Sequence, residues 1–333
     1  MGDQITTVEL DCADGAAVQR LAQEHDLVLG ALSSQVGLTV LEAVIESGRP
    51  YCDISFMPER AADLDEKARQ AGVCAVVDFG VAPGMSHLLA AYGASQLDEV
   101  VSIEIYVGGL PRRPAWPFFY KAGFSPADVI EEYTRPTRLV EDGKVVVREA
   151  LTEPEMIDFK EVGSLEAVNT DGLRSLVETL DVPEMKEKTL RYPGHYELMR
   201  IFRATGLFST EPINVNGQSV VPRDVISALM FPLWTYEPGE EDLTVMRIIV
   251  DGHEDGQAMR LQWDLTDFYS TQMQATSMSR TTAFPCTILG RMLEDKTFDK
   301  PGVHTPELLA TEPGLVEAVL AQHELRGVHY ERV

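Results

Sequence analysis

The sequence predicts an α/β chain in which an incomplete, doubly wound parallel sheet is joined to an α+β domain built on an antiparallel sheet. Two patterns support this fold class. In residues 1–90, short apolar segments alternate with segments of helical length, as in parallel strands joined by right-handed crossovers. Beyond residue 100, apolar and polar residues alternate singly, which is typical of antiparallel strands exposed on one face.

The N-terminal elements follow one another at the spacing that a parallel sheet requires. Asp14 is a suitable N-cap for the first helix. Gly48 and Gly72 stand where two later helices should end in a left-handed residue. We therefore expect strands at residues 6–10, 26–32, 51–54 and 73–79, and helices at residues 14–25, 38–47 and 61–70.

The central residues carry the signals of antiparallel strands. Residues 100–108 alternate between apolar and polar side chains, and Asp142-Gly143 is a favourable turn between two short strands in residues 138–147. Residues 243–265 repeat this arrangement over a greater length. A last helix is expected at about residues 281–293, before an acidic C-terminal segment.

Composition excludes several classes of function. The formal net charge of −25 disfavours binding to nucleic acids and to anionic membranes, because both require clustered basic residues. The four cysteines and seven histidines show no metal-ligand spacing. The sequence has no apolar run long enough to span a bilayer, and its first residues do not resemble a secretory leader. We therefore expect a cytoplasmic chain with free thiols and no metal, membrane or nucleic-acid partner.

One feature of dinucleotide-binding sheets is absent from the sequence. Such sheets begin with a strand, a Gly-x-Gly-x-x-Gly turn and a helix whose N-terminus faces the pyrophosphate. No glycines stand at this spacing, so the expected sheet is of the Rossmann type without its first βαβ unit. Either the sequence is an N-terminally shortened version of a longer protein, or the strand at residues 6–10 pairs directly with the strand at residues 26–32. We expect the first explanation to hold.

Several motifs, taken together, resemble one family. Residues 78–85 read Asp-Phe-Gly-Val-Ala-Pro-Gly-Met, residues 106–111 read Tyr-Val-Gly-Gly-Leu-Pro, and residues 189–195 read Thr-Leu-Arg-Tyr-Pro-Gly-His. Residues 279–283 read Ser-Arg-Thr-Thr-Ala. In this order they resemble the saccharopine dehydrogenase and lysine dehydrogenase family, and the first motif is closer to the lysine dehydrogenase branch.

This resemblance implies an amino-acid oxidoreductase that transfers hydride from a carbon bearing an amine to NAD or NADP. It also implies a homodimer with a small-molecule substrate. On this basis residues 1–90 and 275–333 are the remnant of the dinucleotide-binding domain. Residues 91–274 are the substrate-binding and dimerisation domain. The sequence does not distinguish NAD from NADP, because the acidic residue that would do so belongs to the missing unit.

The expected cofactor site lies at the carboxyl ends of the parallel strands. Asp53 and Asp78 each follow a predicted strand and are candidate proton-transfer groups. Asp53 has a turn or N-cap role as its alternative, and Asp78 has the closing of its strand. Small residues and a tight turn at the same edge are the candidate cofactor contacts: Gly30, Ala31, Leu32, Gly80, Pro83 and Gly84.

The expected substrate site draws on the motifs in residues 91–274. Arg191 is a forked donor suited to a carboxylate, with an internal salt bridge as its alternative. His195 is a third catalytic candidate, with a helix cap as its alternative, whereas His87 is expected on the first turn of a packed helix. The remaining candidate substrate contacts are Tyr192, Tyr106, Phe124 and Thr170, and Tyr106 has the core as its alternative.

The resemblance separates two substrates. Saccharopine-oxidising enzymes meet the second arm of their substrate with an arginine after a Phe-Ser segment. Here Phe124-Ser125 is followed by Pro126, Ala127 and Asp128. This departure favours lysine or a related amine, oxidised to a semialdehyde through an imine that water hydrolyses. The alternatives are saccharopine itself, or a cofactor-deficient family member with a regulatory or binding role.

Overall fold

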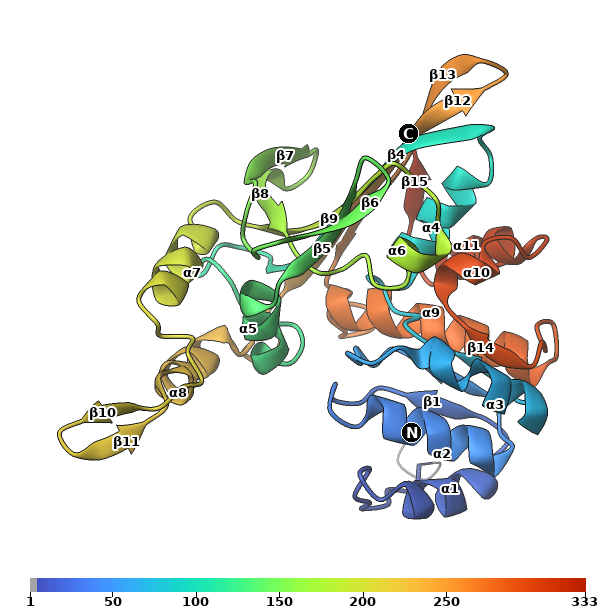
Figure 1. The fold of residues 1–333 in the computed structure, drawn as a ribbon, viewed down its shortest axis with the longest axis horizontal. Helices are drawn as coiled ribbons and strands as arrows, with labels where there is room; N and C mark the ends of the chain where they lie inside the picture. The colour runs from blue at the N-terminus through green and yellow to red at the C-terminus, as the bar shows by residue number, and fades with distance from the viewer. Residues whose placement is uncertain (1–4) are drawn as a thin grey trace. The chain divides into compact units, whose positions relative to one another are not determined.

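The computed structural model describes residues 5–333, which form two compact units (Figure 1). The first unit contains the chain up to Met85 together with Thr282–Leu309. The second contains Ser86–Thr281 together with Ala310–Val333. The C-terminal residues 310–333 therefore belong with the second unit, whereas the sequence had placed them in the dinucleotide-binding domain. The reason is that their last strand pairs with the sheet of the second unit.

The first unit is built on a four-stranded parallel sheet in the order β1-β2-β3-β14. Its strands are short, and β2 and β3 are buried along their whole length, as expected for a parallel sheet covered on both faces. The strands are β1 (Val28–Gly30), β2 (Tyr51–Asp53), β3 (Cys74–Val76) and β14 (Gly302–His304). The helices are α1 (Gly15–Gln23), α2 (Gly37–Ser47), η1 (Ala61–Leu64), α3 (Asp65–Ala71) and α10 (Pro306–Leu309).

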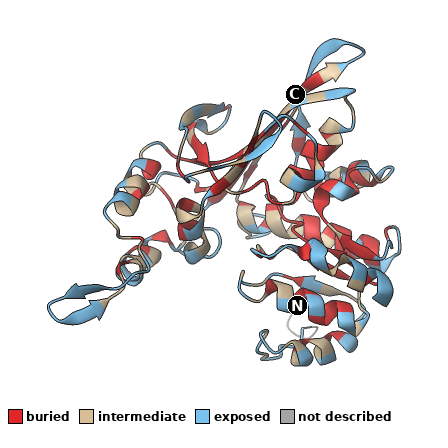
Figure 2. Ribbon diagram, in the orientation of Figure 1, coloured by how far each residue is buried: buried red, intermediate tan, exposed pale blue. Residues whose placement is uncertain are grey.

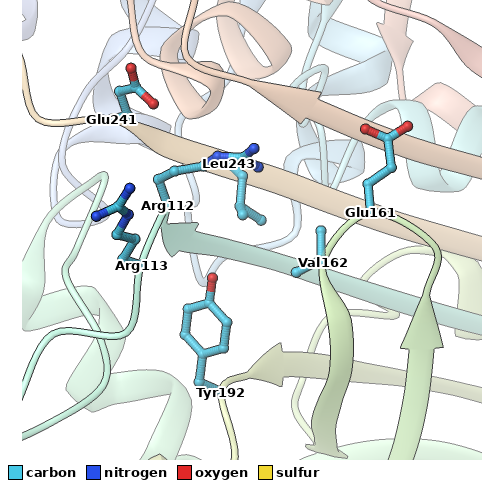
Figure 3. A pocket seen from close by; sticks show the side chains of 7 residues that line it. All are labelled: Arg112, Arg113, Glu161, Val162, Tyr192, Glu241 and Leu243. Atoms are coloured by element: carbon cyan, nitrogen blue, oxygen red, sulfur yellow. The ribbon is translucent and has the colours of Figure 1, made fainter.

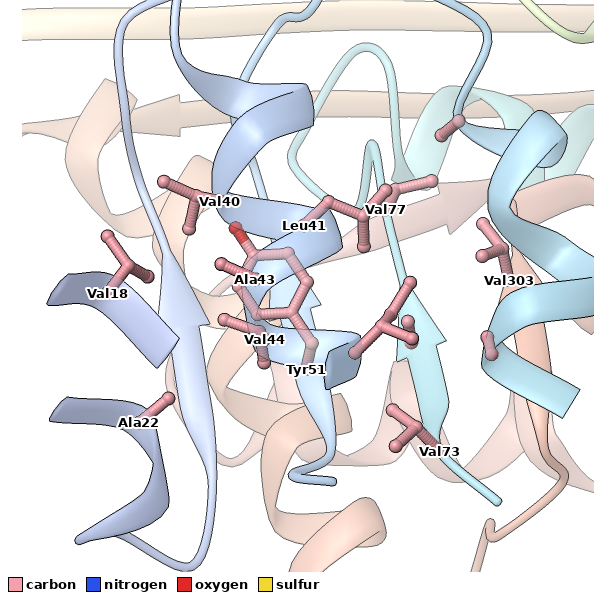
Figure 4. Packing of buried hydrophobic residues seen from close by; sticks show 14 of the residues in the cluster. Val18, Ala22, Val40, Leu41, Ala43, Val44, Tyr51, Val73, Val77 and Val303 are labelled. Atoms are coloured by element: carbon pink, nitrogen blue, oxygen red, sulfur yellow. The ribbon is translucent and has the colours of Figure 1, made fainter. Parts of the chain in front are cut away.

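The core of this unit explains why the helices form where they do. Val18 and Ala22 of α1 pack toward α2, whose Leu41 and Val44 face the sheet (Figure 4). The Asp14 side chain accepts a hydrogen bond from the backbone N–H of Ala17, which confirms the predicted cap. Gly48 and Gly72 end α2 and α3 in left-handed conformations, as predicted.

The expected strand at residues 6–10 is wrong. These residues form no strand, and the side chains of Ile5 and Val8 are 74% and 59% exposed. They pair neither with β1 nor with any other strand of the described residues. Alternating side chains favour a strand only where a neighbouring strand accepts the backbone hydrogen bonds. In contrast, β14 was not predicted from the sequence. Its three residues, late in the chain, add a strand to this sheet beside β3.

The second unit is built on a nine-stranded sheet in the order β15-β13-β12-β4-β9-β5-β6, with β7 and β8 attached beside β9. The predicted antiparallel hairpins are confirmed, but β4 and β9 run parallel, so the sheet is mixed. Its strands are β4 (Glu99–Pro111), β5 (Thr137–Glu141), β6 (Lys144–Arg148), β7 (Glu155–Phe159), β8 (Gly163–Asn169), β9 (Glu184–Arg191), β12 (Asp242–Glu254), β13 (Gln257–Phe268) and β15 (Tyr330–Arg332).

Helices and one separate hairpin complete the second unit. The hairpin of β10 (Ile213–Val215) and β11 (Gln218–Val220) is largely exposed (Figure 2). The α9 helix begins in the second unit and continues into the first. The helices are α4 (Met85–Ala94), α5 (Pro126–Thr134), α6 (Leu176–Thr179), α7 (His195–Ala204), α8 (Pro222–Trp234), α9 (Ser277–Glu294) and α11 (Leu315–Glu324).

Within residues 5–333, no helix combines the length and the apolar character needed to cross a membrane. In the same part of the chain, no group of three or more His, Cys, Asp or Glu side chains is arranged to hold a metal ion.

Candidate functional site

The carboxyl edge of the parallel sheet gathers the predicted cofactor and proton-transfer residues of the first unit. Gly30 ends β1 and Asp53 ends β2, and the segment with Asp78 and Gly80 follows β3. Parallel strands place their carboxyl ends side by side, and ligands of open α/β sheets bind at that edge. Backbone hydrogen bonds join the three ends, from Ile54 N–H to Gly30 O and from Phe79 N–H to Asp53 O.

Asp53 is the most constrained carboxyl group at this edge. It is fully buried, and its Oδ1 accepts hydrogen bonds from the Ser55 backbone N–H (2.9 Å) and the Ser55 hydroxyl (2.6 Å). The same hydroxyl accepts from the Leu32 backbone N–H, so one serine ties the ends of β1 and β2 together. Among residues 5–333, Oδ2 has no hydrogen-bond partner of normal geometry. A buried carboxylate oxygen left in this way is available to a donor from a ligand.

The environment of Asp53 also changes its acidity. Burial raises the pKa of Asp53 to about 6, and the hydrogen bonds from Ser55 oppose that rise. The neighbouring Asp78 carboxyl group raises it further. A carboxyl group that titrates near neutral pH is suited to proton transfer, which is consistent with its predicted role.

Gly30, a predicted cofactor contact, lies where the protein's own side chains pack closely. A Cβ at this position would lie 2.0 Å from the Tyr51 hydroxyl and 2.3 Å from Asp53 Oδ1. The space beside Gly30 is therefore filled by the protein's own side chains, and glycine is needed there so that Tyr51 and Asp53 can pack. The adjoining Ala31 and Leu32 continue along the edge, where Leu32 is anchored by Ser55.

The turn after β3 is closed by its own backbone. Gly80 N–H donates to Pro83 O, and Met85 N–H donates back to Gly80 O. Gly84 has a φ of 137°, and a Cβ there would lie 1.9 Å from Gly80 O, so only glycine fits. The peptide bond between Ala82 and Pro83 is cis. Asp78 is buried at the start of this turn with a φ of 56°.

These features fit part of a dinucleotide site. The unsatisfied Oδ2 of Asp53 and the compact turn at Gly80 and Gly84 offer an acceptor and a close backbone approach at the edge where such ligands bind. They provide no counterpart to the Gly-x-Gly-x-x-Gly turn, whose spacing occurs nowhere in the sequence. The residues that would hold a nicotinamide cofactor are therefore those at the ends of β2 and β3.

In the second unit, Arg191 occupies a closed network. Its guanidinium donates from Nε to the Tyr133 hydroxyl (3.0 Å) and from Nη1 to Leu190 O (2.9 Å), and Nη2 lies 3.5 Å from Glu132 Oε2. The guanidinium carbon lies 4.5 Å from the centre of the Tyr120 ring, and the residue is 2% exposed. These contacts favour the internal ion pair over the predicted substrate carboxylate contact.

His195 belongs to the same network, and the structure does not support its predicted catalytic role. It is fully buried, its Nδ1 donates to Phe118 O (2.8 Å), and its Nε2 accepts from the Tyr133 hydroxyl (2.9 Å). Burial and the charge of Arg191 lower the pKa of His195 to about 3. Both ring nitrogens are engaged and the ring stays neutral, so it holds α7 in place rather than exchanging protons.

The other predicted substrate contacts are distributed over the second unit. The Tyr106 hydroxyl donates to Glu104 (3.0 Å) and lies 3.3 Å from Glu155, so it takes part in a charged cluster of the sheet. Thr170 is buried with its hydroxyl 2.7 Å from that of Thr189. Phe124 is 41% exposed, immediately before the residue that caps α5.

Tyr192 lines a hollow at the carboxyl ends of the parallel pair β4 and β9 (Figure 3). Its hydroxyl donates to Pro111 O (3.0 Å). The hollow has a volume of about 450 Å³ and is also lined by Arg112, Arg113, Glu161, Val162, Glu241 and Leu243. Tyr192 is thus separated from Arg191, its neighbour in sequence, which points into the closed network.

One buried carboxyl group was missed from the sequence. Glu187 lies on β9, where alternation places it on the same face as Thr189 and Arg191. It is 4% exposed and sits beside Thr170, whose backbone N–H donates to Glu187 O. Recognising residues 184–191 as a strand would have aligned these three side chains, because residues two apart share one face.

Comparisons with known proteins agree with both units. The family description "Saccharopine dehydrogenase NADP binding domain" matches residues 1–76, and "Saccharopine dehydrogenase C-terminal domain" matches residues 80–328. The saccharopine dehydrogenase [NADP(+), L-glutamate-forming] of Schizosaccharomyces pombe is 22% identical over 90% of this chain and 83% of its own length. A carboxyaminopropylagmatine dehydrogenase of Synechocystis is 22% identical over 97% of this chain and 85% of its own length.

Solved structures show the same fold. Apo saccharopine dehydrogenase (L-Glu forming) from Saccharomyces cerevisiae aligns with a TM-score of 0.80 at 17% identity, covering 98% of this chain and 88% of its own. The homospermidine synthase of Legionella pneumophila, solved with NAD, aligns with a TM-score of 0.64 at 11% identity, covering 99% and 80%. The closer likeness to the lysine dehydrogenase branch stays a prediction.

Proposed function

The chain belongs to the saccharopine dehydrogenase family, whose members are NAD(P)-dependent dehydrogenases acting on CH–NH groups, and we propose that it oxidises the amine of lysine or a related amino acid to a semialdehyde. A bound nicotinamide cofactor would accept hydride from the carbon that bears the amine, and water would hydrolyse the imine that results. The cofactor supplies the redox chemistry, and the protein supplies position and proton transfer.

The observation that carries this proposal is the edge formed by Asp53 and the turn at Gly84. A buried carboxyl group with one unsatisfied oxygen stands at the end of β2, in the unit that the NADP-binding description covers. In this proposal Asp53 and Asp78 face the cofactor and the reacting nitrogen, and the turn at Gly80, Pro83 and Gly84 contacts the cofactor. We assign no catalytic role to His195.

The preference for a small amine rests on the start of α5. Ser125 caps this helix by accepting a hydrogen bond from the Asp128 backbone N–H. The next three residues are Pro126, Ala127 and Asp128, so no guanidinium stands where the resemblance places one in saccharopine-oxidising enzymes. An acidic residue there would repel the extra carboxylates of saccharopine.

The test is a turnover panel with the purified chain. Reduced nicotinamide is followed after mixing with L-lysine, saccharopine or carboxynorspermidine, each with NAD⁺ and with NADP⁺. The proposal expects kcat/KM for lysine to exceed that for saccharopine by at least about 10-fold, the effect of one charge-assisted contact. Preference for saccharopine would reject the substrate assignment, and no turnover with any amine would reject the function.

We propose in addition that the chain is a homodimer. Sedimentation equilibrium of the purified protein tests this directly, and a mass of one chain at micromolar concentration would reject it.

A further inference from the structure

A hollow of the second unit gathers charged side chains that have no partner within the described protein. It is the hollow of about 450 Å³ at the carboxyl ends of β4 and β9, a volume within the range of ligand sites (Figure 3). Arg112 and Arg113 follow β4. Glu241 precedes β12, and Glu161 lies in the turn between β7 and β8. Among residues 5–333, none of these four side chains forms a hydrogen bond or an ion pair.

Other arginines of the same sheet are paired with acids. Arg247 and Arg260 each donate two hydrogen bonds of 2.6–2.8 Å to the aspartate that faces them across the β12–β13 hairpin. On a chain with a formal net charge of −25, carboxylates are abundant partners for guanidinium groups. In the hollow, guanidinium and carboxylate groups line the same space without pairing, so both kinds of charge are available to a ligand.

Arg112 is held by an aromatic ring rather than by an acid. Its guanidinium carbon lies 3.9 Å from the centre of the Phe268 ring, and its backbone N–H donates to Glu241 O (2.9 Å). Burial raises the pKa of Tyr192, and the charge of Arg112 opposes that rise, as expected for a guanidinium beside the Tyr192 ring. Stacking occupies a face of the guanidinium group, whereas its N–H donors lie at its edge. Those donors can meet a planar carboxylate through two parallel hydrogen bonds.

The floor of the hollow is apolar. Leu243 and the ring of Tyr192 are buried in one hydrophobic cluster of the sheet, and the half-buried Val162 packs against it. The Tyr192 hydroxyl is already engaged by a backbone carbonyl. Leu190 belongs to the same cluster, and because successive strand residues point to opposite faces, Arg191 points away from the hollow. A ligand therefore meets carbon at the floor and charges at the rim.

We propose that this hollow binds a free α-amino acid with an apolar side chain. The two guanidinium groups hold its carboxylate, the carboxylates of the rim hold its ammonium group, and its side chain lies on the apolar floor. The opposite charges of the lining cancel, and a zwitterion likewise carries no net charge. An anion would in addition be repelled by the net charge of the chain, −25. The site is independent of the oxidation proposed above, because it requires no cofactor and no residue of the first unit.

Equilibrium dialysis of the purified full chain against isotope-labelled L-leucine tests the site. Leucine has no side-chain amine, so its binding does not depend on the proposed oxidation of lysine. It should bind saturably. Isocaproate, which lacks the ammonium group, and isoamylamine, which lacks the carboxylate, should each compete at least about 10-fold more weakly than leucine, because each leaves charges of the rim unmatched. Absence of saturable leucine binding, or equal competition by either analogue, overturns the proposal.

Variants test whether leucine binds in this hollow. Arg112→Met removes the stacked guanidinium group and should weaken leucine binding at least about 10-fold, the effect of one charge-assisted contact. Glu161→Gln and Glu241→Gln, combined, should weaken the binding of leucine but not of isocaproate, which has no ammonium group. Arg20→Met, at an exposed position of α1 in the first unit, is the matched control and should bind leucine like the wild type. Unchanged leucine affinity in Arg112→Met, or an equal loss in Arg20→Met, overturns the assignment.

Discussion

Strand β9 carries buried polar side chains on one face, and those in its middle and at its end differ in whether their hydrogen bonds are satisfied. At the end, Arg191, Tyr133 and His195 form a chain of hydrogen bonds that runs to the Phe118 carbonyl. No buried side-chain nitrogen or oxygen of these three residues is left without a partner. In the middle, Glu187 keeps one carboxylate oxygen that no residue from 5 to 333 satisfies.

This contrast shows that residue type alone does not identify a reactive group. An arginine and a histidine in a Pro-Gly motif are attractive catalytic candidates, yet here each one satisfies the other through Tyr133. A glutamate between two lysines attracts no notice in the sequence, yet it is the group left incomplete. What distinguishes the two is hydrogen-bond satisfaction, which depends on partners far away in sequence.

The largest expected effect concerns the stability contribution of Glu187. Burial raises the folded pKa of its carboxyl group to about 8, above the value near 4.5 expected for an unfolded chain. The folded state thus keeps a proton that the unfolded state has released, and stability falls as pH rises from about 4.5 to about 8. Above pH 8, the free energy of unfolding of Glu187→Gln should exceed that of the wild type by on the order of 4 kcal/mol.

Urea unfolding at pH 5 and pH 9 measures this difference. The gain should be present at pH 9 and nearly absent at pH 5. A gain of equal size at both pH values would mean that ionisation of Glu187 is not its cause.

Arg191→Met should show the second largest effect. Methionine fills much of the volume but leaves Tyr133 and the Leu190 carbonyl without their donor and Glu132 without its cation. Because the Glu132 side chain is 28% exposed, we expect a loss of about 3 kcal/mol, at the lower end for a broken buried pair. Urea unfolding at neutral pH checks this.

The contrary result for Arg191 is also specific. A stably folded Arg191→Met protein whose KM for lysine rises while kcat is unchanged would restore Arg191 as a substrate contact. The contrast between a satisfied Arg191 and an unsatisfied Glu187 on β9 would then no longer hold.

His195→Gln should produce the smallest of the three effects. The amide can replace only one of the two hydrogen bonds, so the free energy of unfolding should fall by about 1 kcal/mol. Because the ring is already neutral above a pKa of about 3, the pH dependence of kcat/KM should not change. If the variant loses a titrating limb near neutral pH, His195 exchanges protons and the structural role is wrong.

The local parts of the fold were predictable, and the long-range parts were not. The N-cap at Asp14 and the left-handed ends at Gly48 and Gly72 depend on neighbouring residues, which the sequence displays. The strand β14 and the pairing of β15 with β13 depend on segments more than 60 residues from their partners. The absence of a strand at residues 6–10 depends on a partner that the described chain does not offer.

The candidate site divides in the same way. The motif of residues 78–85 identified a turn that only Gly84 can complete, because a positive φ and a close backbone contact are local requirements. Gly30 is predicted as a cofactor contact, and the structure adds a packing requirement that the sequence does not display, because a Cβ there would meet Tyr51, a residue of the next strand. The buried carboxyl group of Glu187 packs against Gly172 and His87, which lie on other elements.

Equilibrium titration of the chain with NADH and NADPH tests the central claim most directly, because the proposed oxidation requires a bound nicotinamide cofactor. Fluorescence of the reduced nicotinamide should show saturable binding of at least one nucleotide. Asp53→Asn, which weakens the acceptor at the end of β2, should reduce that affinity, whereas the exposed Glu197→Gln should not. Failure of the wild type to bind either nucleotide would contradict the account and identify the chain as a family member without cofactor.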